Sequence, residues 1–514
     1  MSWCGKPHAM KPVENNKDGD RSIVSAGESR FDELRAKVGI VLAPGLFVLM
    51  LVLPFPGLST DAHRLAAIMV AVITLWVTEA IPLPVTALLG PTLAVILGVA
   101  PAGQAFAQFA NPLIILFIGS FILAQAIFVH RLNERIAYGV MSWKVIGARP
   151  ARIMIAYGGI AAVCSAWMSN TATAAMLLPI GLSLLAFMES EGDISKNYGT
   201  VLMLVTAYGC SLGGIATIIG TPPNVIAVGM IEQYAGVQIT FVEWMIFAVP
   251  ISLLMLLFLF FYLNWVGGAG VTEIPGAERI IQERKAALGA WKPGERNVLI
   301  AFLVTVALWV IPGLLPLIPI DTPAFTSFVD QLRAAVPISV AAIVGTTLLF
   351  VIPISRSQRQ TITWKQAAQI DWGTILLFGG GLALGDLARQ TLLAEAVGQG
   401  ITSMLPVSSI VGLTFASAVF GVILSETMSN TAAATIAVPI IISIAQAAGV
   451  NPVPPAIAAS LAASVAVVLP VSTPPNAIVY SSGKVPLMQM VRYGLILDGV
   501  AILIIPAVVL LFMG

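Results

Sequence analysis

Two short polar motifs, each present twice, carry the side chains that could bind ions or a polar solute. "SNTATAAMLLPI" spans residues 169–180, and "SNTAAATIAVPI" spans residues 429–440. "GTPPNVI" begins at Gly220, and "STPPNAI" begins at Ser472. All four lie in apolar sequence, where hydroxyl and amide oxygens are the ligands that hard cations prefer. In and beside the motifs, these oxygens come from Ser165, Ser169, Asn170, Thr171, Thr221, Ser425, Ser429, Asn430, Thr431 and Thr473.

The paired prolines of the second motif predict breaks in two helices. Pro222-Pro223 and Pro474-Pro475 each remove two backbone donors and clash with the preceding turn. Broken backbone at membrane depth is tolerated only where it is buried in protein or lines a watery cavity. We therefore expect the two breaks and the two Ser-Asn-Thr motifs to converge near the middle of the membrane.

The motifs contain no positively charged residue. Helix N-termini could orient N–H groups toward an anion. An anion taken from water into a low-dielectric site still needs a counter-charge. Cations bound at the same place would supply it, so this chemistry predicts coupled binding of an anion and cations.

The composition is that of a polytopic membrane protein. Of the 514 residues, 58% are hydrophobic and 10% are charged, whereas soluble proteins have about 25% charged residues. The net charge of +1 offers no field for nucleic acid. The cysteines and histidines have no metal-ligand spacing, and no nucleophile with a base or phosphate-cradling glycine loop is present, so an enzyme is not expected.

A helix needs about 20 apolar residues to cross a membrane. The sequence predicts an all-α fold with about 11 transmembrane helices. These spans are 38–56, 62–80, 83–100, 111–130, 198–231, 240–266, 297–316, 333–352, 372–388, 456–480 and 489–513. Residues 150–188 and 404–448 are each too long for one crossing and hold Ser-Asn-Thr near the middle, which predicts two re-entrant hairpins. The two broken helices are 198–231 and 456–480.

The distribution of lysine and arginine predicts the orientation. If both hairpins enter and leave on one side, an N-terminus in the cytoplasm places every basic cluster there. The C-terminus is then external. Residues 1–37 are polar without a signal-peptide core, so we interpret them as a cytosolic tail. The clusters are Arg131, Arg135, Lys144, Arg149 and Arg152; Arg279, Arg284, Lys285, Lys292 and Arg296; Arg356, Arg359 and Lys365; and Lys484 and Arg492.

The two halves of the chain are related to each other. "LFIGSFILAQAIFVHRL" at 116–132 resembles "LFGGGLALGDLARQTLL" at 377–393, and both polar motifs recur in the same order at nearly the same spacing. Since the halves face opposite ways in the predicted topology, this is an inverted repeat, which is typical of secondary transporters with a site at the repeat interface. The predicted units are the tail, a first repeat at 38–266, a cytoplasmic linker at 267–296 and a second repeat at 297–514.

Other interpretations compete with this one. A single Ser-Asn-Thr in a transmembrane segment is more often an interhelical hydrogen-bonding group, but two copies at hairpin centres favour a site. Glu79 and Glu426 are ionisable residues in apolar surroundings and are either functional or structural hydrogen-bonding groups. A channel would need a continuous pore, and a sensor would usually carry a soluble signalling domain.

At these residues the sequence resembles the divalent anion/sodium symporter family. The motifs that carry the resemblance are "WVTEAIPLPVTALLGP" at 76–91, "SNTATAAMLLPI", "GTPPN", "SETMSNTAAATIAVPI" and "STPPN". The resemblance implies a homodimer with a scaffold part and a mobile transport part that carries substrate by an elevator-type displacement.

The resemblance also implies roles for particular residues. One sodium site would use Ser165, Ser169, Asn170 and Gly220, and a second would use Ser425, Met428, Asn430, Ser472 and Pro474. Substrate would contact Ser169, Asn170, Thr171, Thr221, Ser429, Asn430, Thr431, Thr473 and Pro474. No lysine or histidine lies near the motifs to replace a sodium ion, which favours sodium coupling over exchange.

The expected function is sodium-coupled import of C4-dicarboxylates such as succinate, malate and fumarate across a cell membrane, which we interpret as a bacterial inner membrane. Two carboxylates fit two opposed motifs, one each. The alternatives are sodium/sulfate symport and sodium-independent dicarboxylate exchange. The expected partners are the dianion, sodium ions, the lipid bilayer and a second copy of the chain, without nucleic acid.

Overall fold

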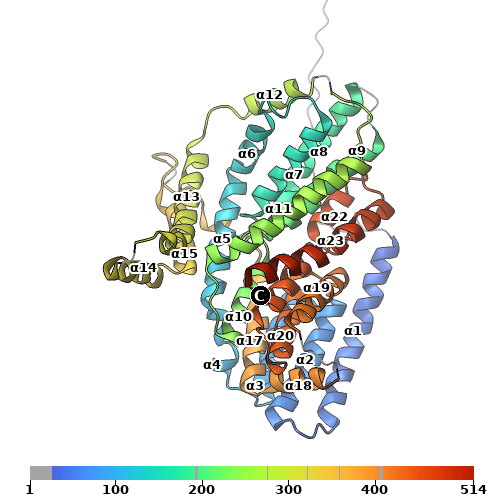
Figure 1. Ribbon diagram of the computed structural model, residues 1–514, viewed down its shortest axis with the longest axis vertical. Helices are drawn as coiled ribbons and strands as arrows, with labels where there is room; N and C mark the ends of the chain where they lie inside the picture. Colours follow the sequence, from blue (N-terminus) through green and yellow to red (C-terminus); the bar gives the residue numbers. More distant parts are fainter. Residues whose placement is uncertain are drawn as a thin grey trace, which may run out of the picture.

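The computed structural model describes residues 26–191, 195–274, 276–320, 322–357, 359–404 and 409–513. Most of the predicted tail, residues 1–25, lies outside this part of the chain. The described residues form α-helices and two short 3-10 helices without a strand, which confirms the predicted all-α class. Figure 1 shows the helices as one elongated assembly.

The first half of the chain begins with a long helix and reaches the linker. Its helices are α1 (Ala26–Val52), α2 (Thr60–Thr78), α3 (Leu83–Ile96), α4 (Ala102–Ala105), η1 (Ala107–Ala110), α5 (Pro112–Val129), α6 (Leu132–Met141), α7 (Pro150–Ser165), α8 (Asn170–Glu191), α9 (Lys196–Gly214), α10 (Pro222–Ala235), α11 (Phe241–Val266) and α12 (Ala277–Ala287).

The second half follows the same order of long helices, hairpin and broken helix. Its elements are α13 (Pro293–Leu314), η2 (Leu315–Leu317), α14 (Pro323–Ala335), α15 (Ile338–Val351), α16 (Trp364–Ala367), α17 (Trp372–Gln390), α18 (Leu393–Met404), α19 (Ile410–Thr427), α20 (Asn430–Ala447), α21 (Val453–Val465), α22 (Pro474–Tyr480) and α23 (Leu487–Met513).

Both Ser-Asn-Thr motifs lie where one helix of a contacting pair ends and the next begins. α7 ends at Ser165 and α8 begins at Asn170, whereas α19 ends at Thr427 and α20 begins at Asn430. The far ends of the first pair also meet, because the Tyr198 hydroxyl just beyond α8 donates to the Pro150 carbonyl at 2.8 Å. The two apolar stretches are therefore folded back on themselves with the motif at the tip.

The two Pro-Pro motifs interrupt helices at the predicted places. α9 ends at Gly214 and α10 begins at Pro222, and α21 ends at Val465 and α22 begins at Pro474. Every described residue of α9 from Tyr198 onward and every residue of α21 is buried. The breaks are thus enclosed by protein, as the unpaired backbone groups of an interrupted helix require.

The number of helices that could each cross a membrane is smaller than predicted. Among the described residues, nine helices are long and apolar enough, or ten if the bent pair α14 and α15 forms one span. Three predicted segments contribute shorter apolar helices instead, namely α3, α7 and α21. The Pro-Pro motif accounts for the short α21, because it divides one span in two; the figure of about 11 spans stays a prediction.

Some elements were not predicted from the sequence. α1 begins at Ala26, within the region expected to be a polar tail, and α12 forms a helix inside the expected linker. The linker packs against α6, where Arg135 forms a buried ion pair with Glu295 at 2.9 Å. α12 also lies close to α6 in Figure 1.

The loops that carry the basic clusters contact one another. Arg135 donates to the Gly289 carbonyl at 3.1 Å, which joins the first and second clusters. The His130 ring lies 2.8 Å from the Thr361 carbonyl beside the third cluster. Lys484 pairs with Glu189 at 2.7 Å at the end of α8. These contacts are the ones expected if the clusters share one face of the membrane.

Candidate functional site

A cavity of about 760 Å³ lies where both tips and both helix breaks meet. One wall comes from the tips and breaks, and the other comes from α5, the start of α17 and the residues just before each of α3 and α17. All nine residues predicted to contact substrate line this cavity: Ser169, Asn170, Thr171, Thr221, Ser429, Asn430, Thr431, Thr473 and Pro474. Their role in binding substrate remains a prediction.

The two tips present the same local structure to the cavity. The hydroxyl of Ser169 accepts a hydrogen bond from the Ala172 amide at 3.2 Å, and that of Ser429 accepts one from the Ala432 amide at 3.3 Å. Each serine thus caps the N-terminus of the helix that follows it. Two helix N-termini, with their unpaired N–H groups and positive dipole ends, therefore reach one cavity and favour an anion there.

The asparagines of the two Pro-Pro motifs hold the unwound segments in place. Asn224 donates to the carbonyls of Gly214 at 3.0 Å and Thr217 at 2.7 Å. Asn476 donates in the same way to Val467 at 2.9 Å and Leu469 at 3.0 Å. Sequence reasoning gave neither asparagine a role, although each directly follows a predicted break.

The first group of predicted sodium ligands is close together in space. The Ser165 hydroxyl donates to Oδ1 of Asn170 at 2.5 Å, and the Thr217 hydroxyl donates to the Ala166 carbonyl. Gly220 ends the unwound segment, and a Cβ there would lie 2.4 Å from the Gly214 carbonyl oxygen. Neutral hydroxyl, amide and carbonyl oxygens converge here, which fits a hard cation.

The second group repeats this arrangement. The Ser425 hydroxyl lies 2.7 Å from Oδ1 of Asn430 and 2.6 Å from the Ala463 carbonyl oxygen. Asn430 in turn donates to the Ser464 carbonyl at 3.3 Å. Met428 is buried at the tip, and Ser472 donates to Glu426 at 2.5 Å. The donor set again consists of oxygens, so it also fits a hard cation; both assignments remain predictions.

A Cβ at Gly214 would lie 2.4 Å from Oδ1 of Asn170. Gly214→Ala is therefore expected to displace the Asn170 amide and to raise about tenfold the sodium concentration that half-saturates transport, which corresponds to about 1.4 kcal/mol. Gly159→Ala is the matched control, because a Cβ at Gly159 meets nothing within 4 Å. An unchanged sodium dependence in Gly214→Ala would show that Asn170 does not bind sodium.

The opposite wall of the cavity contains polar side chains that sequence reasoning missed. Gln125 on α5 and Asp371 and Thr374 at the start of α17 line it. Asp371 accepts hydrogen bonds from the Thr374 amide at 3.0 Å and hydroxyl at 2.6 Å. A single polar residue in the apolar span 111–130 was the available signal for Gln125. No lining residue is a lysine, arginine or histidine.

The predicted ionisable candidate Glu79 lies away from this cavity. It ends α2 in a left-handed backbone conformation and forms an ion pair with Arg35 at 3.1 Å. Its observed contact is therefore structural. Glu426, in contrast, lies beside the second group of predicted sodium ligands.

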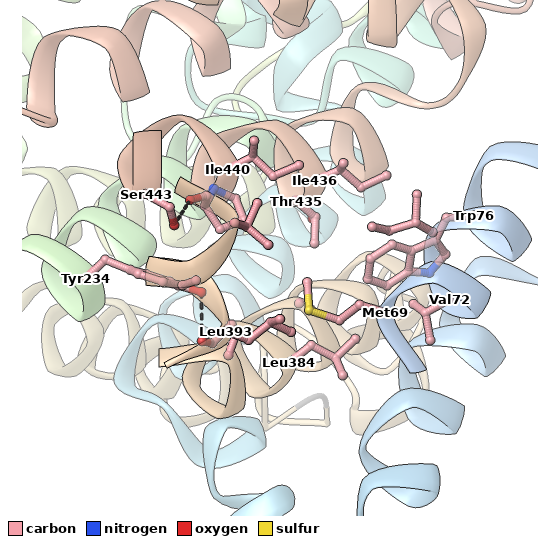
Figure 2. A pocket seen from close by; sticks show the side chains of 17 residues that line it. Met69, Val72, Trp76, Tyr234, Leu384, Leu393, Thr435, Ile436, Ile440 and Ser443 are labelled. Atoms are coloured by element: carbon pink, nitrogen blue, oxygen red, sulfur yellow. Dashed lines mark hydrogen bonds between the residues drawn. The ribbon is translucent and has the colours of Figure 1, made fainter. Parts of the chain in front are cut away.

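A second, small cavity lies among α2, α10, α17, α18 and α20 (Figure 2). Its lining is almost entirely apolar, with Met69, Trp76 and Leu384 among the side chains that face it. Its polar groups are already hydrogen-bonded, since the Tyr234 hydroxyl donates to the Gly385 carbonyl at 2.7 Å and the Ser443 hydroxyl donates to Pro439 at 2.8 Å. It offers no group to a dianion. No cluster of three or more His, Cys, Asp or Glu side chains occurs among the described residues either.

Nine or more apolar spans around an enclosed polar cavity define a multi-pass membrane transporter. The family described as sodium:sulfate symporter transmembrane region matches residues 35–513. The chain belongs to this family, which confirms the family expected from the sequence motifs. Its members are transporters and not enzymes.

Curated relatives match over nearly the whole chain. The sodium-dependent dicarboxylate transporter SdcS of Staphylococcus saprophyticus is 34% identical over 92% of this chain and 90% of its own length. SdcS of Staphylococcus aureus strain bovine RF122 is 32% identical over the same shares.

Two solved structures share the fold at low sequence identity. The YdaH transporter of Alcanivorax borkumensis has a TM-score of 0.54 at 12% identity and covers 95% of this chain and 98% of its own. MtrF of Neisseria gonorrhoeae has a TM-score of 0.54 at 13% identity, with coverages of 92% and 94%. At this identity the likeness concerns the fold alone.

Proposed function

We propose that the protein imports C4-dicarboxylates such as succinate, malate and fumarate together with sodium ions. The observation that carries the proposal is the meeting of two serine-capped helix N-termini, those of α8 and α20, at one cavity. Each can bind one carboxylate of the substrate. The relatives named above as sodium-dependent dicarboxylate transporters support both the substrate class and the coupling ion.

In this proposal, the residues of the cavity divide the work between ions and substrate. Ser165, Asn170 and Gly220 hold one sodium ion, and Ser425, Asn430 and the Met428 backbone hold another. Ser169, Thr171, Thr221, Ser429, Thr431 and Thr473 contact the carboxylates. The bound sodium ions offset the charge of the dianion, which no lysine or arginine of the cavity lining does. Sodium therefore has to bind for the substrate to be held.

The proposal extends to topology and movement. The two halves form an inverted repeat, the hairpins are re-entrant, and the N-terminus faces the cytoplasm of a cell with the protein in its inner membrane. The contacts among the basic loops support a common cytoplasmic face. The protein works as a homodimer, and the part that holds the site moves across the membrane in an elevator-type displacement.

Sulfate is the second candidate substrate because it appears in the description of the family. A cavity of about 760 Å³ with two anion-attracting tips suits an extended dianion better than a compact one. Sodium-independent exchange of dicarboxylates is the third possibility.

Uptake of labelled succinate into proteoliposomes tests these alternatives together. The proposal predicts uptake that follows an inward sodium gradient and stops when potassium replaces sodium. Uptake that ignores sodium but requires internal succinate would make the protein an exchanger. Labelled sulfate that enters while succinate does not would assign the sulfate reading.

A further inference from the structure

A buried carboxylate pair lies beside the second group of predicted sodium ligands. Asp498, on α23, is 4% exposed. Neither of its carboxylate oxygens has a hydrogen-bond partner among the described residues, and both are shielded from solvent. An ionised carboxylate without a partner in such a place costs several kcal/mol. Something that the chain itself does not supply must therefore compensate it.

The group that faces Asp498 is another acid. Its strongest interaction with a side chain is with Glu426, at the end of α19, and it lies beside the Val467 backbone. Glu426 accepts hydrogen bonds from the Val468 amide at 2.9 Å and from the Ser472 hydroxyl at 2.5 Å. No lysine, arginine or histidine of the described chain forms an ion pair with either acid.

The surrounding backbone adds to the negative potential. α19 ends at Thr427 and α21 ends at Val465, and both helices pack against α23, which carries Asp498. The C-terminus of a helix bears the negative end of its dipole and favours a cation. Two acids, a hydroxyl and two helix C-termini thus meet in a part of the protein where no positive charge was found.

The acidic pair is absent from the first half of the chain. When the two Ser-Asn-Thr motifs are aligned, Ala166 corresponds to Glu426, and when the two Pro-Pro motifs are aligned, Gly220 corresponds to Ser472. The Ala166 carbonyl accepts from Thr217, which is a contact between neutral groups. The paired asparagine sites are alike in the two halves, whereas the acids belong to the second half only.

We propose that Glu426 and Asp498 bind a sodium ion of their own, in addition to the ions at Asn170 and Asn430. The proposal rests on the sodium coupling proposed above and adds a third ion to it. A monovalent ion suits the site better than calcium, because calcium takes six to eight oxygen ligands and this site offers two carboxylates and a hydroxyl already bonded to one of them. The third ion leaves a complex of three sodium ions and a dianion with one net positive charge.

Equilibrium binding of radioactive sodium to the purified full-length protein, without any substrate, counts the ions directly. Asp498→Asn keeps the shape of the side chain and removes its charge. We expect the wild type to bind three sodium ions per chain and Asp498→Asn to bind two. The exposed Asp330→Asn on α14 is the matched control and should bind as many ions as the wild type.

A second variant covers the case in which Asp498→Asn does not fold. Glu426→Gln should also lower the count by one, and combining both substitutions should lower it no further, because the acids share one ion. An unchanged count in a folded Asp498→Asn or Glu426→Gln would overturn the proposal and leave a shared proton between the acids. Calcium binding that displaces no sodium and is lost in Asp498→Asn would overturn it as well.

The assay separates this proposal from the proposed transport activity. Sodium counts do not depend on succinate, so a protein that fails to transport succinate can still bind the third ion. Conversely, sodium-driven succinate uptake with a count of two would uphold the transport proposal and refute this one.

Discussion

Asn170→Ala and Asn430→Ala are each expected to lower sodium-driven succinate uptake at limiting sodium by about 100-fold or more, a loss of about 2.7 kcal/mol. Oδ1 of each asparagine lies within 2.7 Å of a serine hydroxyl that is a predicted sodium ligand, Ser165 or Ser425. Truncation removes one ligand of the ion and leaves the buried serine with one partner fewer, at a further cost of about 1–3 kcal/mol. The initial rate of labelled succinate uptake into proteoliposomes measures the effect.

A matched substitution shows whether such losses are specific. Asn451→Ala removes an asparagine that accepts a hydrogen bond from the Val453 amide at 3.0 Å, outside the cavity. It should leave the sodium dependence of uptake unchanged. Normal uptake in both Asn170→Ala and Asn430→Ala would remove the two tips from the transport site. Loss in one variant alone would mean that a single tip binds the coupling ion.

The parts of the site that the sequence predicts are those fixed by local chemistry. The prolines at 222–223 and 474–475 cannot continue a helix, so α10 and α22 begin at the predicted breaks. Ser169 and Ser429 have the short hydroxyl side chain that caps a helix, and each precedes one. These features depend on a few neighbouring residues, and repetition in the two halves makes them visible.

The remainder of the site depends on packing between distant segments. Gln125 and Asp371 face the cavity only because α5 and the start of α17 pack across from the tips. Nothing in their local sequence indicates that neighbour. α14 and α18 were missed for a related reason, because each lies between or beside longer apolar spans that dominate the hydrophobic pattern.

Asp498 shows how a usable signal can be overlooked. It is an acid within the predicted span 489–513, where an ionisable residue indicates a functional site by default. Only the structure pairs it with Glu426, because α19 and α23 are brought together by the fold. The sequence could have singled out each acid alone but could not show that they share a site.

Membrane voltage is expected to change succinate accumulation about 50-fold for each 100 mV, inside negative. Three sodium ions and a dianion carry one net positive charge inward, which gains about 2.3 kcal/mol per 100 mV, and this energy corresponds to the 50-fold change. A dianion that crosses alone would instead be driven outward by about 4.6 kcal/mol. Two sodium ions would cancel the charge and make accumulation independent of voltage.

The measurement sets the voltage of proteoliposomes with a potassium gradient and valinomycin at a fixed sodium gradient, and follows labelled succinate to its plateau. The wild type should show the 50-fold effect together with an inward positive current. Asp498→Asn, if it still transports with two ions, should show neither. A wild type whose accumulation ignores voltage would carry two sodium ions per succinate, and the charge of the buried acids would then have to be balanced by a proton that stays with the protein throughout the cycle.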